Sequence, residues 1–276
     1  MPKTGGAEMR PGDAPAGTAP WLDADWPAPA GVRVLTTLRG GPGVSRPPFD
    51  RLNLGANSGD DVAAVARNRD ILAALAGLPS PPRWLRQVHG TRVVACDPAA
   101  VDVDPPEGDA AVASTPGTVL AILTADCLPV AFASRDGRRI GAAHAGWRGL
   151  AAGVLEATLR AIGAPPGDCL AWLGPCAGPQ AYEVGAEVRD AFVGADPGAA
   201  AAFEATRPGH WRADLYALAR RRLVAAGMAA ADIHGGGLCT ISDPARFYSH
   251  RRDQRTGRMA TLVWRAPGQV PSDLRQ

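Results

Sequence analysis

The sequence predicts an α/β (α+β) protein whose sheets are mixed or antiparallel, and not a pure array of βαβ units. Apolar, β-branched runs of strand length interleave with segments of helical spacing along most of the 276 residues. Many predicted strands are joined by short turns, whereas parallel neighbours need a crossover of about a dozen residues or more. A chain of this length with 46% hydrophobic residues is sufficient for a sizeable core.

The first part of the chain predicts a tail and then a helix. Residues 1–20 are rich in Pro, Gly and Ala and predict a disordered N-terminal tail, so the folded domain begins at residue 21 and extends over 21–276. Asp60 or Asp61 caps the predicted helix. The apolar residues expected on its buried face are Val62, Val65, Ile71, Leu72 and Leu75. The elements expected before it are an extended lead-in (21–29), a strand (32–38) and a glycine-rich loop (39–45).

Between this helix and residue 113, the sequence predicts a β-hairpin, a long loop and a strand. The hairpin pairs residues 84–88 with residues 92–95 and has His89 at its turn. Residues 96–108 are rich in Pro and Asp and predict the loop. Residues 109–113 then lead into the central part of the chain.

The stretch 118–150 carries reactive residues at the ends of predicted strands. A strand over 118–124 is followed by Asp126 and Cys127 in a sharp loop, and a later strand ends at His144. Because rigid elements can aim side chains from such junctions, we expect this stretch to hold the chemistry.

The remaining residues predict alternating helices and strands. Apolar residues at helical spacing from Leu150 to Ile162 predict a helix after His144. Residues 194–209 are rich in Ala and predict an irregular connection. The other elements expected here are strands at 170–173 and 259–264 and helices at 186–193 and 215–226.

Composition excludes several classes of function. A net charge of +2 gives no reason to expect nucleic acid or an anionic membrane as a partner. The only lysine is Lys3, so Schiff-base and P-loop lysine chemistry do not fit the folded part. The five cysteines form no CxxC pair, and the sequence shows no secretory signal and no apolar run of membrane-spanning length. We therefore expect reduced thiols and a cytoplasmic protein.

Three residues from this region could form one metal site. His89, Cys127 and His144 offer two imidazoles and a thiolate, which suits zinc and leaves a fourth position for water or substrate. Their spacing matches no local zinc-finger rule, and each residue taken singly fits an ordinary buried or solvated role. The same residues also fit a nucleophile pair, Cys127 with His144 or His89, oriented by Asp126. These alternatives stay open on the residues alone.

Arginines near the same loops are candidates for anion binding. Arg148 stands four residues after His144 at a predicted helix start, where a phosphate or carboxylate is favoured. Arg39 lies at the glycine-rich loop, whose backbone N–H groups could form an anion nest. Arg251 has the same two interpretations as Arg148, an anion ligand or a surface salt bridge. His250 is a further candidate for lining the site.

Several motifs together resemble one known family. They occur in the order TTLRGGPGVS, LNLGANSGDD, QVHG, TADCLPV, HAGWRGLAAGV, GPCAGPQAYEVG and YSHRRDQRTGRMA. Their order and number resemble the YfiH family, also called the laccase-domain or polyphenol-oxidase-like family. The resemblance covers residues 21–264. It implies a single domain with a four-layer α/β/β/α sandwich, and a zinc ion bound by His89, Cys127 and His144.

The resemblance also implies an activity. That activity is phosphorolysis of inosine, guanosine, adenosine and methylthioadenosine, with deamination of adenosine as a side reaction. An older description of the family is copper-dependent polyphenol oxidation, and copper is the alternative metal. A multicopper oxidase needs far more imidazoles than the five histidines of this chain, so we place nucleoside chemistry first.

Within that activity, we expect a purine nucleoside and phosphate as the ligands of a monomer. Arg148, with Arg39, would orient phosphate, and Asp126 would transfer a proton or orient a ligand. Asn53 and Gln87 would hydrogen-bond the ribose or base. The loop around Arg39 is shifted relative to the family pattern, and His250 stands where the family usually has Tyr. A cysteine hydrolase acting on an amide of a cell-wall precursor and a non-enzymatic binding module are the alternatives.

Overall fold

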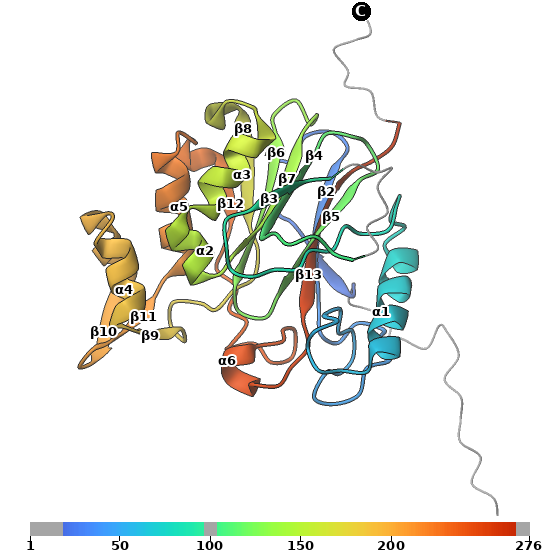
Figure 1. Ribbon diagram of the computed structural model, residues 1–276, viewed down its shortest axis with the longest axis horizontal. Coiled ribbons are helices and arrows are strands. Elements are labelled where there is room, and N and C mark those ends of the chain that lie inside the picture. Colours follow the sequence, from blue (N-terminus) through green and yellow to red (C-terminus); the bar gives the residue numbers. More distant parts are fainter. Residues whose placement is uncertain (1–18, 97–103, 269–276) are drawn as a thin grey trace, which may run out of the picture.

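Two β-sheets stacked face to face form the centre of the molecule (Figure 1). The computed structural model describes residues 19–96 and 104–268. One sheet has four antiparallel strands in the order β1 (Trp21–Asp23), β2 (Val32–Thr37), β13 (Met259–Arg265) and β5 (Val119–Thr124). The other has six strands in the order β12 (Ile233–Gly235), β8 (Cys169–Leu173), β6 (Leu128–Ser134), β7 (Ile140–Ala145), β4 (Ala110–Ala113) and β3 (Val93–Ala95). This sheet is parallel at its two outer pairs and antiparallel between them.

The two sheets share a core of small and β-branched residues. In β6, Ala131 and Ala133 contribute to the core between the sheets, while Val130 and Phe132 belong to the core on the opposite face. Successive side chains of a strand point to opposite faces, so a strand covered on both faces needs a continuous apolar run. All seven residues of β6 are accordingly buried.

Helices cover the outer face of each sheet. On the six-stranded sheet lie α2 (Trp147–Ala152), α3 (Val154–Ile162) and α5 (Leu215–Ala225), whose buried residues join the strands in one core. Helix α1 (Val62–Leu75) lies against the four-stranded sheet through Leu72 (Figure 1). The predicted mixed sheets and the four-layer α/β/β/α sandwich are therefore confirmed.

A smaller unit projects from the side of the six-stranded sheet, at the left of Figure 1. It is a three-stranded antiparallel sheet in the order β10 (Phe203–Arg207), β11 (His210–Ala213) and β9 (Glu183–Gly185), with α4 (Ala186–Val193) packed on it. The short α6 (His250–Asp253) precedes the closing strand β13. Three 3-10 helices complete the elements: Pro166–Asp168, Pro197–Ala202 and Ala230–Asp232.

Helix α1 has a different buried face from the predicted one. Asp61 caps it as expected, but Val62 and Leu75 are 71% and 52% exposed, so those two assignments were wrong. The buried face instead carries Asn68, whose side-chain amide donates to the Ser45 hydroxyl and accepts from a backbone N–H. These polar contacts determine which face of the helix is buried. The spacing of apolar residues in the sequence could not predict them.

The predicted hairpin around His89 is also wrong. Residues 84–88 form no strand, and β3 pairs in parallel with β4 instead. The preceding segment runs along β5, where the Gln87 side chain exchanges two hydrogen bonds with the backbone of Leu123. The side chain of Gln87 therefore makes hydrogen bonds to β5, where a hairpin would have had backbone hydrogen bonds between its own two strands.

Three further predictions need correction. The helix after His144 is split into α2 and α3 at Gly153, whose φ of 102° is left-handed. Residues 203–207 form β10 where an irregular connection was expected. The strand that was expected to end at His144 continues to Ala145, so His144 lies inside β7. The predicted N-terminal tail lies outside the described residues, apart from residues 19 and 20.

The described residues, 19–96 and 104–268, contain no helix with the length and hydrophobicity needed to span a bilayer.

Candidate metal centre

Three side chains distant in sequence meet in one cluster. The potential ligand atoms of His89, Cys127 and His144 all lie within 4.8 Å of one another. The Sγ of Cys127 is 3.7 Å from Nε2 of His89, and the two imidazole centroids are 4.7 Å apart. His144 is buried, Cys127 is partly buried and His89 is exposed, so solvent reaches the cluster from one side. Two imidazoles and a thiolate with an open side fit a three-ligand zinc site better than a closed structural one.

Cys127 stands where the chain crosses from one sheet to the other. Strand β5 belongs to the four-stranded sheet and β6 to the six-stranded one, and only residues 125–127 join them. Asp126 makes this sharp turn with a φ of 97°. Its carboxylate accepts hydrogen bonds from the hydroxyl of Thr240 at 2.6 Å and the backbone N–H of Arg251 at 2.6 Å. These contacts fix the loop that presents the thiol.

A buried carboxylate, Asp109, positions both histidines. Its Oδ1 accepts from the backbone N–H of His89 at 2.8 Å and from Nδ1 of His144 at 2.9 Å. Its Oδ2 accepts from the N–H groups of Gly90 at 2.7 Å and Val88 at 3.1 Å. With Nδ1 of His144 engaged in this way, Nε2 is left to bind a metal. His89 is held in a left-handed conformation with a φ of 62°.

Gly146 lets the helix that follows His144 approach the ligands closely. A Cβ built at this position would lie 2.8 Å from Cδ2 of His89 and 2.9 Å from Sγ of Cys127. Real Cβ atoms do not tolerate contacts this short. The backbone conformation does not require glycine, because any residue can adopt its φ of −61°. Glycine is needed here because there is no space for a side chain.

The electrostatics of the cluster favour a thiolate. Burial opposes ionisation of Cys127, but the charge and hydrogen bonding of His144 and His89 outweigh it and lower its pKa to about 6. Burial likewise opposes a charged His144, yet Cys127 and Asp109 raise its pKa to about 9. Burial also opposes the Asp109 charge, and the hydrogen bonds from His144 and Gly90 still hold the pKa of that carboxyl below its usual value.

The three residues predicted to bind substrate have internal partners. The Asn53 amide donates to Ser58 and Asp60 and accepts two backbone N–H groups, and Gln87 is bonded to β5 as described. The Arg39 guanidinium lies 3.4 Å from a carboxylate oxygen of Asp50. Their substrate-binding roles stay predictions. A substrate that bound to any of these three side chains would have to replace the internal contacts given above.

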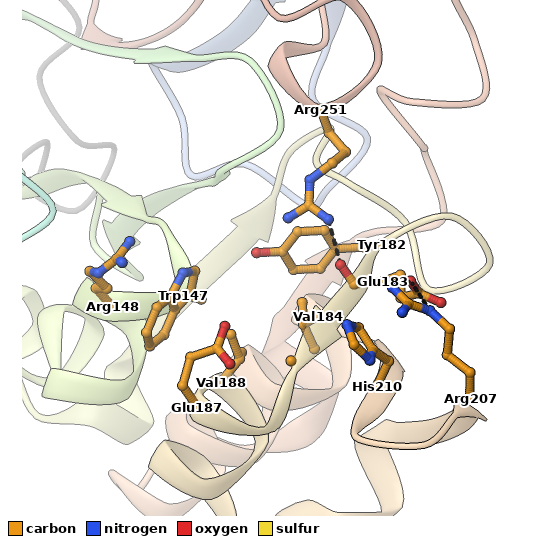
Figure 2. Close-up of a pocket in the computed structure, with 11 residues that line it drawn as sticks. Trp147, Arg148, Tyr182, Glu183, Val184, Glu187, Val188, Arg207, His210 and Arg251 are labelled. Atoms are coloured by element: carbon orange, nitrogen blue, oxygen red, sulfur yellow. Dashed lines mark hydrogen bonds and ion pairs between the residues drawn. The ribbon is translucent and has the colours of Figure 1, made fainter.

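Arg148 is free to meet a ligand. It is exposed on the first turn of α2, and its guanidinium carbon lies 4.4 Å from the centroid of the Trp147 ring. No ion pair joins it to another described residue. It lines a cleft together with Tyr182 and Arg251 (Figure 2). His250 is exposed and has its Nδ1 2.5 Å from the carbonyl oxygen of Gln254.

Sequence reasoning missed Asp109 and Tyr182. Asp109 stands directly before an apolar strand, and that position alone does not distinguish it from a turn residue. Only the pairing of β4 with β7, which places it beside His144, reveals its role. Tyr182 belongs to the GPCAGPQAYEVG motif, to which no chemistry was assigned.

Comparison with known proteins defines the class to which this fold and site belong. A family model described as multi-copper polyphenol oxidoreductase laccase matches residues 33–266, so the chain belongs to that family. A relative named purine nucleoside phosphorylase, from Xylella fastidiosa strain 9a5c, is 62% identical over 249 residues, covering 88% of this chain and 96% of the relative. The purine nucleoside phosphorylase YfiH of Escherichia coli K12 is 49% identical over 241 residues, 87% and 96% of the two chains. The resemblance to the YfiH family is thereby confirmed.

Solved structures share the fold. A Neisseria meningitidis protein of the family called DUF152 superposes with a TM-score of 0.85 at 47% identity, covering 90% of this chain and 100% of the other. YlmD from Geobacillus stearothermophilus gives a TM-score of 0.86 at 31% identity, covering 91% and 97%.

We predict that Gly146→Ala weakens zinc binding about tenfold or more, because the added methyl group displaces His89 or Cys127. A competition titration with a chromophoric chelator measures the effect. Gly167→Ala is the matched control, since its Cβ would have no neighbour closer than 4.0 Å. Equal zinc affinity in both variants would contradict the packing argument.

Zinc affinity should rise about tenfold per pH unit between about pH 7 and 8.5. In this range the thiol of Cys127, with a pKa of about 6, is ionised, while His144, with a pKa of about 9, carries a proton that the metal has to displace. Release of one proton makes binding tighter as the pH rises. The same competition titration, repeated across the range, checks the slope, and a pH-independent affinity would refute the thiolate–imidazolium pair.

Proposed function

We propose that this protein is a zinc-dependent purine nucleoside phosphorylase. Its substrates are inosine, guanosine, adenosine and methylthioadenosine, and adenosine deamination is a side activity. The observation that carries the proposal is the convergence of His89, Cys127 and His144 on one point, oriented by Asp109, in a chain 62% identical to a relative named for this activity. We further propose that residues 21–276 act as one catalytic domain, in a cytoplasmic monomer.

The donor set fits zinc. Two imidazoles and a thiolate are common zinc ligands, and the Asp109–His144 hydrogen bond is the usual outer support of a ligating histidine. Copper is the alternative metal that the family description raises. A laccase-like polyphenol oxidation would need a trinuclear copper centre. Five histidines, of which two join this cluster, leave too few imidazoles for one.

Bound zinc would supply a Lewis acid to a substrate oxygen or lower the pKa of a water molecule. The side chains of the protein would do the positioning. Arg148, which has no ion pair among the described residues, would bind and neutralise phosphate. One phosphate oxygen would attack C1′ of the ribose while the glycosidic bond breaks, and the purine base would leave, taking a proton from solvent. Arg39 is the weaker candidate, because phosphate there would compete with Asp50.

Asp126 would act mainly by orienting the Cys127 loop. Its two carboxylate oxygens already accept hydrogen bonds from Thr240 and Arg251, which favours a positioning role over proton transfer. Asn53 and Gln87 would influence the ribose and base through the loops they hold, because their amides are occupied by protein groups. For deamination, a water molecule would attack C6 of adenine and ammonia would leave; His89, Cys127 and His144 would hold the zinc that activates this water.

One observation favours a second candidate function. A thiol with a pKa of about 6 and an imidazole 3.7 Å away also describe a cysteine nucleophile and its base. Such a hydrolase would act on an amide, for example in a cell-wall precursor. Its activity would survive chelation of metals and would be lost on alkylation of Cys127.

The test is release of hypoxanthine from inosine with and without phosphate. We expect phosphate-dependent release by the zinc-loaded protein, and a loss of about 100-fold or more in Cys127→Ala and after chelation. Cys169→Ala, which removes a buried thiol from β8, is the matched control and should retain activity. No release by folded, zinc-loaded wild type would refute the proposed activity, and chelator-resistant amide hydrolysis would establish the second candidate.

A further inference from the structure

A cleft of about 320 Å³ lies between the start of α2 and the small three-stranded sheet (Figure 2). Its size falls at the lower end of the roughly 300–1,000 Å³ usual for small-molecule sites. Trp147 and Arg148 form one wall, Tyr182 and Glu187 line the other, and Arg251 lies above (Figure 2). With Arg207 and His210 of the small sheet, the cleft draws its lining from four separate parts of the chain.

Two short connections join this cleft to the metal centre. Trp147 directly follows Gly146, which packs against His89 and Cys127. The backbone N–H of Arg251 donates to Asp126, the residue before Cys127. Two lining residues of the cleft are therefore linked, by chain continuity or by a hydrogen bond, to residues that contact or adjoin the His/Cys/His cluster.

Tyr182 is the least expected group in the cleft. Its side chain is almost entirely buried, at 7% exposure, but its hydroxyl is not one of the buried unpaired polar atoms of the described residues, so the oxygen is open to the cleft that the side chain lines. The hydroxyl points toward Trp147 and Arg148 (Figure 2). Burial raises its pKa to about 12, so it remains a hydrogen-bond donor at neutral pH. A hydroxyl that is open to the cleft and has no hydrogen bond to a described residue is available to donate to a ligand there.

Two guanidinium groups face the same space. Arg148 has no ion pair among the described residues, and the guanidinium carbon of Arg251 lies 5.0 Å from the centroid of the Tyr182 ring. One NH group of Arg251 donates to the backbone carbonyl of Glu183, which holds the side chain in place and leaves its other donors available.

The acidic residues of the cleft only partly balance these charges. Glu183 is paired with Arg207 at 2.8 Å, so that pair is neutral. Glu187 is exposed and has no ion pair with a described residue. Two arginines against one free carboxylate leave a net positive charge, which favours an anion.

We propose that Arg148, Arg251 and the Tyr182 hydroxyl form the subsite that binds the phosphate co-substrate, with Glu187 as an opposing charge that limits its affinity. The proposal rests on the proposed phosphorylase activity and assigns the phosphate to this cleft and not to Arg39. Two guanidinium groups and a hydroxyl donor match the three exposed oxygens of a phosphate that keeps its fourth oxygen for attack on C1′. That oxygen would attack C1′ of the bound nucleoside as the glycosidic bond breaks and the purine base leaves.

The test compares steady-state constants of zinc-loaded variants. We expect Arg148→Ala and Arg251→Ala to raise the KM for inorganic phosphate about tenfold or more, and Tyr182→Phe to raise it about threefold to tenfold. Glu187→Gln should lower it about threefold, because a repelling charge is removed. The KM for inosine should stay within about twofold in all four. Arg160→Ala, which removes an exposed arginine of α3, is the matched control and should leave both constants unchanged.

An unchanged phosphate KM in Arg148→Ala and Tyr182→Phe would overturn the subsite. These two variants suffice even where Arg251→Ala fails to fold. If wild type shows no phosphorolysis, the proposed function fails, and equilibrium dialysis with radiolabelled phosphate then tests the subsite separately. Saturable binding that Arg148→Ala and Tyr182→Phe weaken and Arg160→Ala retains would support it. No saturable binding, or binding insensitive to those two changes, would overturn it.

Discussion

The candidate site depends on one buried carboxylate. Asp109 is completely inaccessible to solvent, and an ionised group in that position is stable only when its hydrogen-bonding capacity is filled. Three successive N–H groups from residues 88–90 and the Nδ1–H of His144 supply four donors. The loop of residues 88–90 and strand β7 are thereby held together. The orientation of the His144 ring and the position of the His89 backbone follow from this interaction and not from the local sequence of either residue.

The stacked sheets provide the second constraint. Cys127 occurs at the three-residue crossing from β5 to β6, so its position is set by both sheets at once. His144 belongs to β7, the direct antiparallel neighbour of β6, and Pro129 is its register partner. The thiol and the buried imidazole therefore lie on adjacent strands of a rigid sheet. His89, the exposed member of the three, lies in a loop between α1 and β3 and would be the most accessible of the residues that could hold a metal.

The sequence predicted those parts of the molecule that depend on local pattern. The apolar runs that became β5, β6 and β13, and the three candidate ligands, follow from hydrophobicity, strand ends and ligand chemistry. The failures involved side chains that replace backbone or apolar contacts. Asn68 sets the face of α1, and Gln87 completes β5 where a hairpin was expected. Asp109 and Tyr182 were missed because their neighbours in the fold are distant in the sequence. Asp109 bonds His144, which is 35 residues away, and Tyr182 lies against Arg251, which is 69 residues away.

The measurement that tests this account most directly is the zinc affinity of Asp109→Asn relative to wild type, with circular dichroism as the check of folding. The amide would set its NH₂ group against backbone N–H donors and lose the charge that supports His144. We predict an affinity lower by about 10- to 100-fold in a folded protein. An affinity equal to that of wild type would contradict the claim that this carboxylate builds the metal centre.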